Sequence, residues 1–165
     1  MANGSVAIGS DHAGFSLKGH IAIYLKGLGY EILDVGPHTG DPVDFPDYAE
    51  AVGQAILAGE AKRGVLICGS GVGVSIAANK MPGIRAALCH DIYSAHQSVE
   101  HDDANVLALG AQVVGPAVVP ELVKAFLEAS FSGKENHRRR VDKIKAMEKR
   151  FADGLGICQS KLSPS

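Results

Sequence analysis

The chain has 165 residues, a length that fits one domain better than two and is enough to bury a substantial core. Its 16 Lys and Arg nearly balance its 18 Asp and Glu, which does not favour a nucleic-acid partner, and no run approaches the ~20 apolar residues of a membrane helix. Three cysteines, Cys68, Cys89 and Cys158, cannot all pair within one chain and are not spaced like zinc ligands. Because the N-terminus is not signal-like, the expected compartment is a reducing cytoplasm.

Short apolar runs alternate with stretches of helical spacing along the chain. In chain order, the first half predicts a strand at 5–9, a helix over 17–28, a strand at 30–34, a helix over 47–59 with Asp47 as N-cap, a strand at 65–68 and a short helix at 73–81. The second half predicts a strand at 85–89, a helix at about 91–101, a strand at 105–109, and helices over 117–130 and 134–151.

Continuously apolar strands separated by helices predict a parallel sheet that is covered on both faces. The expected fold class is therefore α/β, a Rossmann-like three-layer α/β/α sandwich with a five-stranded parallel sheet and an extra C-terminal helix. Residues 1–151 form the single predicted domain, and residues 152–165 are expected to be a mobile tail.

The last predicted helix carries an apolar stripe on one side. The stripe consists of Val141, Ile144, Met147 and Phe151. At about 100° per residue, His137 and Arg140 lie on the same side. Such a helix can dock on its own domain or on a second subunit, and the sequence leaves both arrangements open.

Ligands of open parallel sheets bind outside the carboxyl ends of the strands, and three polar stretches of this chain fall there: residues 9–14, 68–73 and 89–91. The glycines of the second stretch would let the backbone approach a ligand closely, and free N–H groups there could bind an anion. A plain strand-to-helix turn would have the same composition, and the loop matches neither G-x-G-x-x-G nor a Walker loop.

Cys68 ends its strand directly before the glycines. A thiol amid free N–H groups at a helix start can exist partly as thiolate and act as nucleophile or general base, but most free cysteines are small buried apolar residues. Asp11 could bind a sugar hydroxyl or orient a base, although a helix cap near Gly14 would explain it equally well. A cap would not explain His12.

The polar run 101–105 lies just before the fifth predicted strand, at its amino end. On the usual layout this is away from Cys68 of the same chain. His101 is therefore either part of a solvated loop or serves the site of another chain.

Four segments together resemble a known family. They are S-D-H-A-G (10–14), I-C-G-S-G-V-G-V-S-I-A-A-N-K (67–80), G-I-R-A-A-L-C (83–89) and H-D-D-A-N-V-L-A-L-G (101–110). This combination, with the chain from residue 5 to about 151, resembles ribose-5-phosphate isomerase type B, whose wider family includes subunits of galactose-6-phosphate isomerase and allose-6-phosphate isomerase. The family's fold is a Rossmann-like sandwich, in agreement with the pattern of elements.

The resemblance implies metal-independent interconversion of an aldose and a ketose sugar phosphate through a cis-enediolate, with no cofactor. Cys68 matches the base over the C2–H, Ser70 stands where many relatives have Thr, and the N–H groups of residues 69–73 would stabilise the oxyanion. His101 matches the group that opens the sugar ring, and Asp11 its partner at the sugar end. The substrate-binding residues that the resemblance implies are His12, Gly69, Gly71, Val72, Gly73, Asn105, His137 and Arg140.

The resemblance also implies a homodimer, or a dimer of dimers, with shared active sites. If His101 of one chain completes the Cys68 site of another, its position at the amino end of a strand is explained. The partners expected are thus a sugar phosphate and a second copy of the chain, with no nucleic acid and no membrane.

Four positions depart from the family pattern: Gln112 and Asn136 stand in place of arginines, Phe45 in place of Tyr and Asp102 in place of a frequent Asn. Since bidentate arginine–phosphate contacts are strong, these changes bear on substrate length and phosphate affinity. The phosphate is expected at His12, His137 and Arg140. The leading hypothesis is interconversion of ribose 5-phosphate and ribulose 5-phosphate. The alternatives are an isomerase of allose or galactose 6-phosphate, a tetrose phosphate or a free sugar, and a non-catalytic phosphometabolite-binding module.

Overall fold

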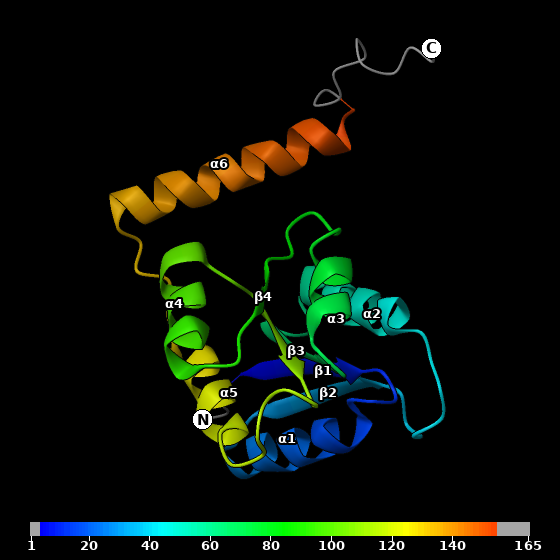
Figure 1. The fold of residues 1–165 in the computed structure, drawn as a ribbon. Coiled ribbons are helices and arrows are strands. Elements are labelled where there is room, and N and C mark those ends of the chain that lie inside the picture. The colour runs from blue at the N-terminus through cyan, green and yellow to red at the C-terminus, as the bar shows by residue number, and fades with distance from the viewer. Residues whose placement is uncertain (1–3, 155–165) are drawn as a thin grey trace, which may run out of the picture.

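A five-stranded parallel sheet in the order β2-β1-β3-β5-β4 forms the centre of the structure (Figure 1). The computed structural model describes residues 4–154. The strands are β1 (Ser5–Ser10), β2 (Glu31–Gly36), β3 (Arg63–Cys68), β4 (Ala86–Leu88) and β5 (Val106–Gly110). Each lies within two residues of its predicted position, and the predicted α/β class is confirmed.

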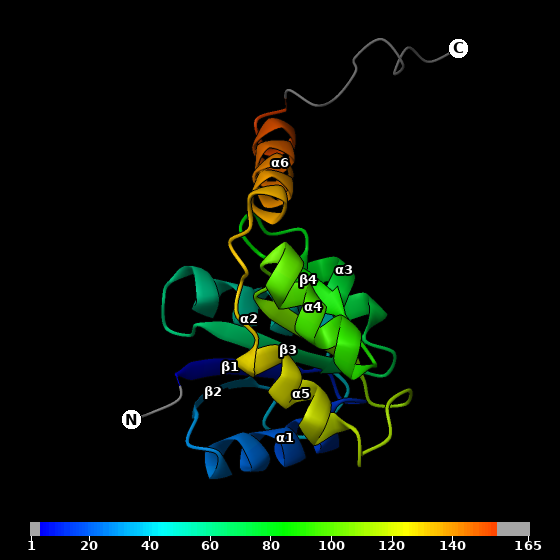
Figure 2. The same cartoon turned by 90° about the vertical axis from the view of Figure 1, so that its left-hand side faces the viewer.

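Residues 4–154 form six helices: α1 (Phe15–Gly27), α2 (Phe45–Leu57), α3 (Val72–Ala78), α4 (Ile92–Asp102), α5 (Val119–Glu128) and α6 (Glu135–Ala152). Helices α1, α4 and α5 cover one face, and α2 and α3 cover the other (Figures 1 and 2). Within residues 4–154, none of the helices combines the length and the apolar character that crossing a membrane requires.

The strands are apolar throughout because both of their faces are buried. Along β3, Val65 and Ile67 pack toward α1, α4 and α5, whereas Leu66 and Cys68 pack toward α2 and α3. All four are at most 5% exposed. Burial on both faces is what a parallel sheet requires, and it explains why no apolar–polar alternation marks these strands.

Helix α2 begins earlier than predicted, so the assignment of Asp47 as its N-cap is wrong. The N-cap is Asp44, and Asp47 lies inside the first turn. Pro46 occupies one of the first two helical positions, where a missing N–H costs nothing and the fixed φ suits the helix. Pro46 is therefore part of the first turn of α2.

Helix α6 lies outside the three layers, where it contacts α4 (Figures 1 and 2). Its own chain buries only the first part of the apolar stripe, because Val141 is 3% exposed while Ile144, Met147 and Phe151 are 37%, 50% and 54% exposed. The predicted tail falls largely outside the described residues: α6 continues through Ala152, and residues 155–165, Cys158 included, lie beyond the described range.

Candidate functional site

The carboxyl ends of β1 and β3 lie at the topological switch point of the sheet. From β1 the chain continues outward to β2, and from β3 it continues toward β5 and β4 on the other side. The two loops at this point lie side by side, since the N–H of Asp11 donates to the carbonyl of Ile67 at 3.1 Å. The stretches after β1 and β3 therefore meet at one edge, as predicted, and parallel sheets bind ligands at such a switch point.

The Cys68 thiol faces the glycine loop, which we define as residues 69–73. Cys68 Sγ accepts a hydrogen bond from the N–H of Gly71 at 3.0 Å, and the residue is 5% exposed. Gly71 has a φ of +78°, and a Cβ there would lie 2.5 Å from Leu88 Cδ1 and 2.7 Å from the carbonyl carbon of Leu109. Only glycine fits this backbone, so the sequence fixes the N–H that points at the thiol.

Ser70 and Val72 form the outer side of the loop. The hydroxyl of Ser70 is solvent-exposed and accepts from the N–H of Val72 at 3.2 Å, and Val72 is the first residue of α3. The structure thus brings six of the predicted residues together at one edge: Cys68, Gly69, Ser70, Gly71, Val72 and Gly73.

Asp11 and His12 follow β1 at the same edge of the sheet. An Asp11 carboxylate oxygen accepts from the N–H of Gly14 at 3.0 Å. Gly14 is itself the N-cap of α1, which has no side-chain cap hydrogen bond, so Asp11 holds the turn that precedes the helix. His12 is exposed, and its Nδ1 accepts from the N–H of Val43 at 3.4 Å. The turn fits closely because a Cβ on Gly14 would lie 2.5 Å from the carbonyl oxygen of Ile67.

Gln112 and Phe45, two of the departures from the family pattern, border the glycine loop. A Cβ on Gly69 would lie 3.4 Å from Gln112 Oε1, and a Cβ on Gly73 would lie 2.9 Å from the Phe45 ring. Both side chains therefore lie next to the glycine loop. Gln112 presents an uncharged amide and Phe45 an apolar ring that is 37% exposed.

His90 is a residue of this edge to which the sequence assigned no role. It follows β4, and its Nε2 accepts from the N–H of Gly110, the last residue of β5, at 2.9 Å. The sequence could have indicated this position, because His90 directly follows a predicted strand and the carboxyl ends of parallel strands lie at one edge of the sheet. Its neighbour Asp91 caps α4, and the hydrogen bonds from Ser94 lower the pKa of that carboxyl.

His101 lies at the other end of β5 from Cys68. It belongs to the last turn of α4, which precedes the amino end of β5, whereas Cys68 pairs with Gly110 at the carboxyl end. The four steps from Val106 to Gly110 span roughly 13 Å at about 3.3 Å each. The structure therefore keeps His101 away from the Cys68 thiol of its own chain, as the sequence predicted.

His101 and His137 stack against each other at this amino edge. Their ring centroids are 4.1 Å apart, Gln97 contacts His101 Nδ1 at 3.1 Å, and Ser132 Oγ contacts His137 Nδ1 at 2.7 Å. Burial, and then the nearby His101, Lys134 and Arg140, lower the pKa of His137. The chain thus brings His101 and His137 together at a cationic edge.

The three consecutive arginines of α6 differ in what they contact. Arg138 donates to the carbonyl of Gly133 at 2.8 Å, and Arg139 pairs with Glu135 at 3.1 Å. Within residues 4–154, Arg140 makes no hydrogen bond or ion pair and is exposed. Of the three, Arg140 is therefore the arginine whose guanidinium is not already engaged within residues 4–154.

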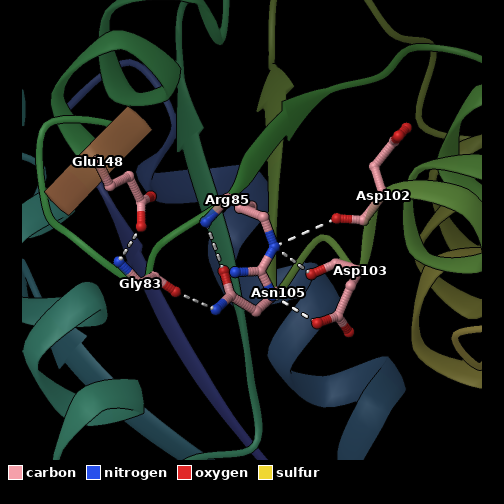
Figure 3. A network of polar contacts seen from close by, with 6 residues as sticks. All are labelled: Gly83, Arg85, Asp102, Asp103, Asn105 and Glu148. Carbon is pink, nitrogen blue, oxygen red and sulfur yellow. Dashed lines mark hydrogen bonds and ion pairs between the residues drawn. The ribbon is translucent and has the colours of Figure 1, made fainter. Parts of the chain in front are cut away.

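Arg85 fastens the end of α4 (Figure 3). Its Nε donates to the carbonyls of Asp103 at 2.8 Å and Asp102 at 3.2 Å, and its Nη2 pairs with the Asp103 carboxylate at 2.6 Å. Asp103 has a φ of +52° and is the C-cap of α4. The positively charged guanidinium thus binds carbonyl oxygens at the C-terminus of a helix, where cations are favoured.

Asn105, predicted to bind substrate, lies at this same amino edge. Its side-chain oxygen accepts from the N–H of Arg85, and its amide nitrogen donates to the carbonyl of Gly83, both at 2.8 Å. The N–H of Gly83 in turn donates to Glu148 of α6 at 3.2 Å (Figure 3). In its own chain Asn105 therefore joins β5 to the 83–85 segment, away from Cys68.

The chain matches a protein-family model described as Ribose/Galactose Isomerase over residues 6–144. It is 46% identical over 145 residues to "Ribose-5-phosphate isomerase B" of Escherichia coli (strain K12), which covers 88% of this chain and 97% of the relative. It is 45% identical over 130 residues to "D-erythrulose-4-phosphate isomerase" of Pectobacterium atrosepticum, covering 78% of this chain and 86% of the relative.

Among solved structures, the chain is similar to ribose-5-phosphate isomerase B of Clostridium thermocellum. The TM-score is 0.87 at 50% sequence identity, and the alignment covers 89% of this chain and 99% of that one.

Proposed function

The chain belongs to the ribose/galactose isomerase family, and from this premise we propose that it interconverts ribose 5-phosphate and ribulose 5-phosphate. As a member it is an enzyme of the sugar-phosphate isomerase class. The observation that carries the proposal is the Cys68 thiol, held by the Gly71 N–H at 3.0 Å at the edge of the sheet where the Asp11–His12 turn also lies. A base and backbone donors next to each other are what an enediolate reaction needs.

Cys68 acts as the base in the proposed reaction. Its thiolate takes the proton from C2 of the open-chain aldose, the electron pair forms the C1–C2 double bond, and the carbonyl oxygen becomes the oxyanion of a cis-enediolate. A proton moves from the C2 hydroxyl to O1, which shifts the negative charge to O2. The thiol then returns its proton to C1 as the carbonyl forms at C2, which gives the ketose and restores the thiolate. The N–H groups of the glycine loop and the Ser70 hydroxyl stabilise the oxyanion, and no electron acceptor is required.

A second copy of the chain completes the proposed site. His101 opens the furanose ring with Asp11 at the sugar end, and His12, His137 and Arg140 hold the phosphate. His101, His137 and Arg140 belong to the amino edge, roughly 13 Å along β5 from Cys68, so they reach a Cys68 edge only on another copy. We therefore propose a homodimer, alone or paired into a dimer of dimers, with shared sites.

The direct test compares ribose 5-phosphate turnover by wild type, Cys68→Ala and the control Cys89→Ala. Cys89 is 4% exposed on the other face of the sheet, and burial raises the pKa of its thiol to about 11, so it is unsuited to act as a base. We expect turnover to be lost in Cys68→Ala and retained in Cys89→Ala. Equal activity of wild type and Cys68→Ala would exclude Cys68 as the base.

Mixing two inactive variants tests the shared site. Cys68→Ala and His101→Ala subunits each retain one half, so hybrid dimers contain one site with both groups intact. We expect partial recovery of turnover when subunit exchange is demonstrated by mass spectrometry of tagged chains. Exchange without recovery would mean that each site is formed by one chain.

A different sugar phosphate is the second candidate substrate. It is favoured by Gln112 beside Gly69, by Asn136 on α6 and by Phe45 beside Gly73, which reduce the number of charged and hydroxyl contacts to substrate. The relative from Pectobacterium is named for a four-carbon sugar phosphate. Values of kcat/KM for tetrose, pentose and hexose phosphates and free sugars would decide between them, and a clear preference for ribose 5-phosphate would eliminate this candidate.

A further inference from the structure

We propose that His90 is a positioning residue for the glycine loop. Its imidazole holds the peptide of Gly110, the loop rests on that peptide, and the N–H groups around Cys68 are thereby fixed. His90 touches neither the thiol nor the glycine loop through any hydrogen bond of residues 4–154, and it acts through Gly110. The catalytic part of this inference rests on the proposed isomerase function, whereas the structural part does not.

The contact between His90 and Gly110 fixes the state of the imidazole ring. Nε2 accepts the Gly110 N–H at 2.9 Å, so this nitrogen carries a lone pair and the proton of the neutral ring is on Nδ1. Strand β4 ends at Leu88, and the last backbone bond between the two strands runs from Cys89 N–H to the carbonyl of Ala108. The side chain of His90 thus accepts a hydrogen bond from the Gly110 N–H of β5, at a position where β4 no longer provides a backbone acceptor.

Gly110 and the glycine loop touch backbone to backbone. A Cβ on Gly110 would lie 2.6 Å from the carbonyl carbon and oxygen of Ser70, and a Cβ on Gly71 would lie 3.0 Å from the nitrogen of Gly110. No side chain separates the two segments, so a shift of the Gly110 peptide must move Ser70 and Gly71. Because interiors are close-packed, there is little free volume to absorb such a shift.

The loop position in turn fixes the groups proposed to do the chemistry. The N–H of Gly71 lies 3.0 Å from Cys68 Sγ, and Ser70 directly precedes it. Oxyanion donors work only when they are held within a fraction of an ångström, and a misplacement of about 1 Å can cost about 100-fold in rate. Loss of the His90 acceptor should therefore reduce kcat with little change in KM.

The test compares variants with and without an acceptor at position 90. His90→Leu removes the acceptor, His90→Phe removes it but keeps a ring, and His90→Gln places an oxygen near the position of Nε2. The control His96→Leu changes a histidine of α4 whose side chain is 53% exposed and pairs with Glu100. We expect a decrease in kcat of about 10- to 100-fold in the Leu and Phe variants, KM within about threefold, near wild-type kcat in His90→Gln, and no change in His96→Leu.

A readout independent of turnover accompanies the kinetics. Hydrogen exchange of the Gly110 amide, followed by NMR, should accelerate at least tenfold in His90→Leu and His90→Phe relative to His96→Leu, and return toward wild type in His90→Gln. The alkylation rate of Cys68, measured by peptide mass spectrometry with the buried Cys89 as internal reference, should change in the same order.

Several outcomes would overturn the proposal. Unchanged Gly110 exchange in both variants without an acceptor would mean that His90 does not hold the peptide. Equal kcat in His90→Gln and His90→Phe would mean that the acceptor is not what matters. If His90→Leu does not fold, His90→Phe and His90→Gln still give the comparison. If the wild type has no isomerase turnover, the proposed function fails, while Gly110 exchange still decides whether His90 holds the loop.

Discussion

Replacing Arg85 by Met tests how the end of α4 is held. Met retains the apolar volume of the stem but removes the guanidinium, which contacts two carbonyls and the Asp103 carboxylate (Figure 3). The side chain of Arg85 is only 15% exposed, so water cannot fully replace these contacts. We expect Arg85→Met to lower the free energy of unfolding.

The magnitude follows from the contacts of Arg85. A hydrogen bond from a charged group contributes about 1.5–3 kcal/mol, and here one Nε–H is shared between two carbonyls. The ion pair adds about 0.5 kcal/mol, because Asp103 is 40% exposed and exposed pairs contribute little. The total is about 2–3.5 kcal/mol, which corresponds to a decrease in Tm of about 4–14 °C for a chain of this size.

Asp103→Asn is the matched control. Asn tolerates the positive φ of this position, and its carbonyl oxygen can still accept from Arg85, so only the charge is lost and the cost should be below about 1 kcal/mol. Urea unfolding of both variants at one fixed protein concentration gives the comparison. If Arg85→Met costs no more than Asp103→Asn, the carbonyl contacts do not hold the helix end and the reasoning is wrong.

Three further variants test separate features. Gly71→Ala should lose about 2–4 kcal/mol of stability, because φ is +78° and the new Cβ meets the backbone of Leu109, whereas Gly19→Ala, with nothing within 4 Å, should not; equal thermal melts would contradict this. Ser10→Ala should raise the free energy of unfolding by about 1 kcal/mol, because the buried Ser10 hydroxyl has no partner among residues 4–154. A lower free energy of unfolding for Ser10→Ala than for wild type, measured by urea unfolding, would refute this. The pKa of His137 is lower than its ordinary value of about 6.5, so the unfolded chain binds the proton more readily and stability falls as pH drops below about 6.5; His137→Gln should flatten this fall in Tm, and an unchanged slope would exclude His137 as its source.

The sequence predicted the sheet and the Cys68 edge well because both depend on local patterns. Continuous apolar runs marked the five strands, and the stretches at 9–14 and 68–73 had to meet once the strands were parallel. The position of His101 at the far end of β5 followed from the same layout. For these features, strand direction alone determines position.

Features that depend on packing between distant segments were not predictable. The sequence predicted Arg85 only as part of a strand. No neighbouring residue indicated that its guanidinium contacts Asp103 at the end of α4. Asn105 was grouped with substrate-binding residues, while its amide is engaged with Arg85 and Gly83. Likewise, the sequence gives no periodicity that links His90 to the Gly110 N–H, because that bond depends on β4 ending at Leu88.

The two edges of the sheet divide the proposed chemistry between copies of the chain. The Cys68 edge offers a thiol and backbone donors, and the amino edge offers His101, His137 and Arg140 beside a lysine. In a twofold dimer, if the amino edge of one copy meets the Cys68 edge of the other, the reverse contact forms as well, and two equivalent sites result. The departures at Gln112 and Phe45 would then act on the same substrate as Asn136 of the other copy. Under this proposal, the effect of a substitution at one edge depends on the groups that the opposite edge still provides, and His12, His137 and Arg140 would together determine the phosphate affinity.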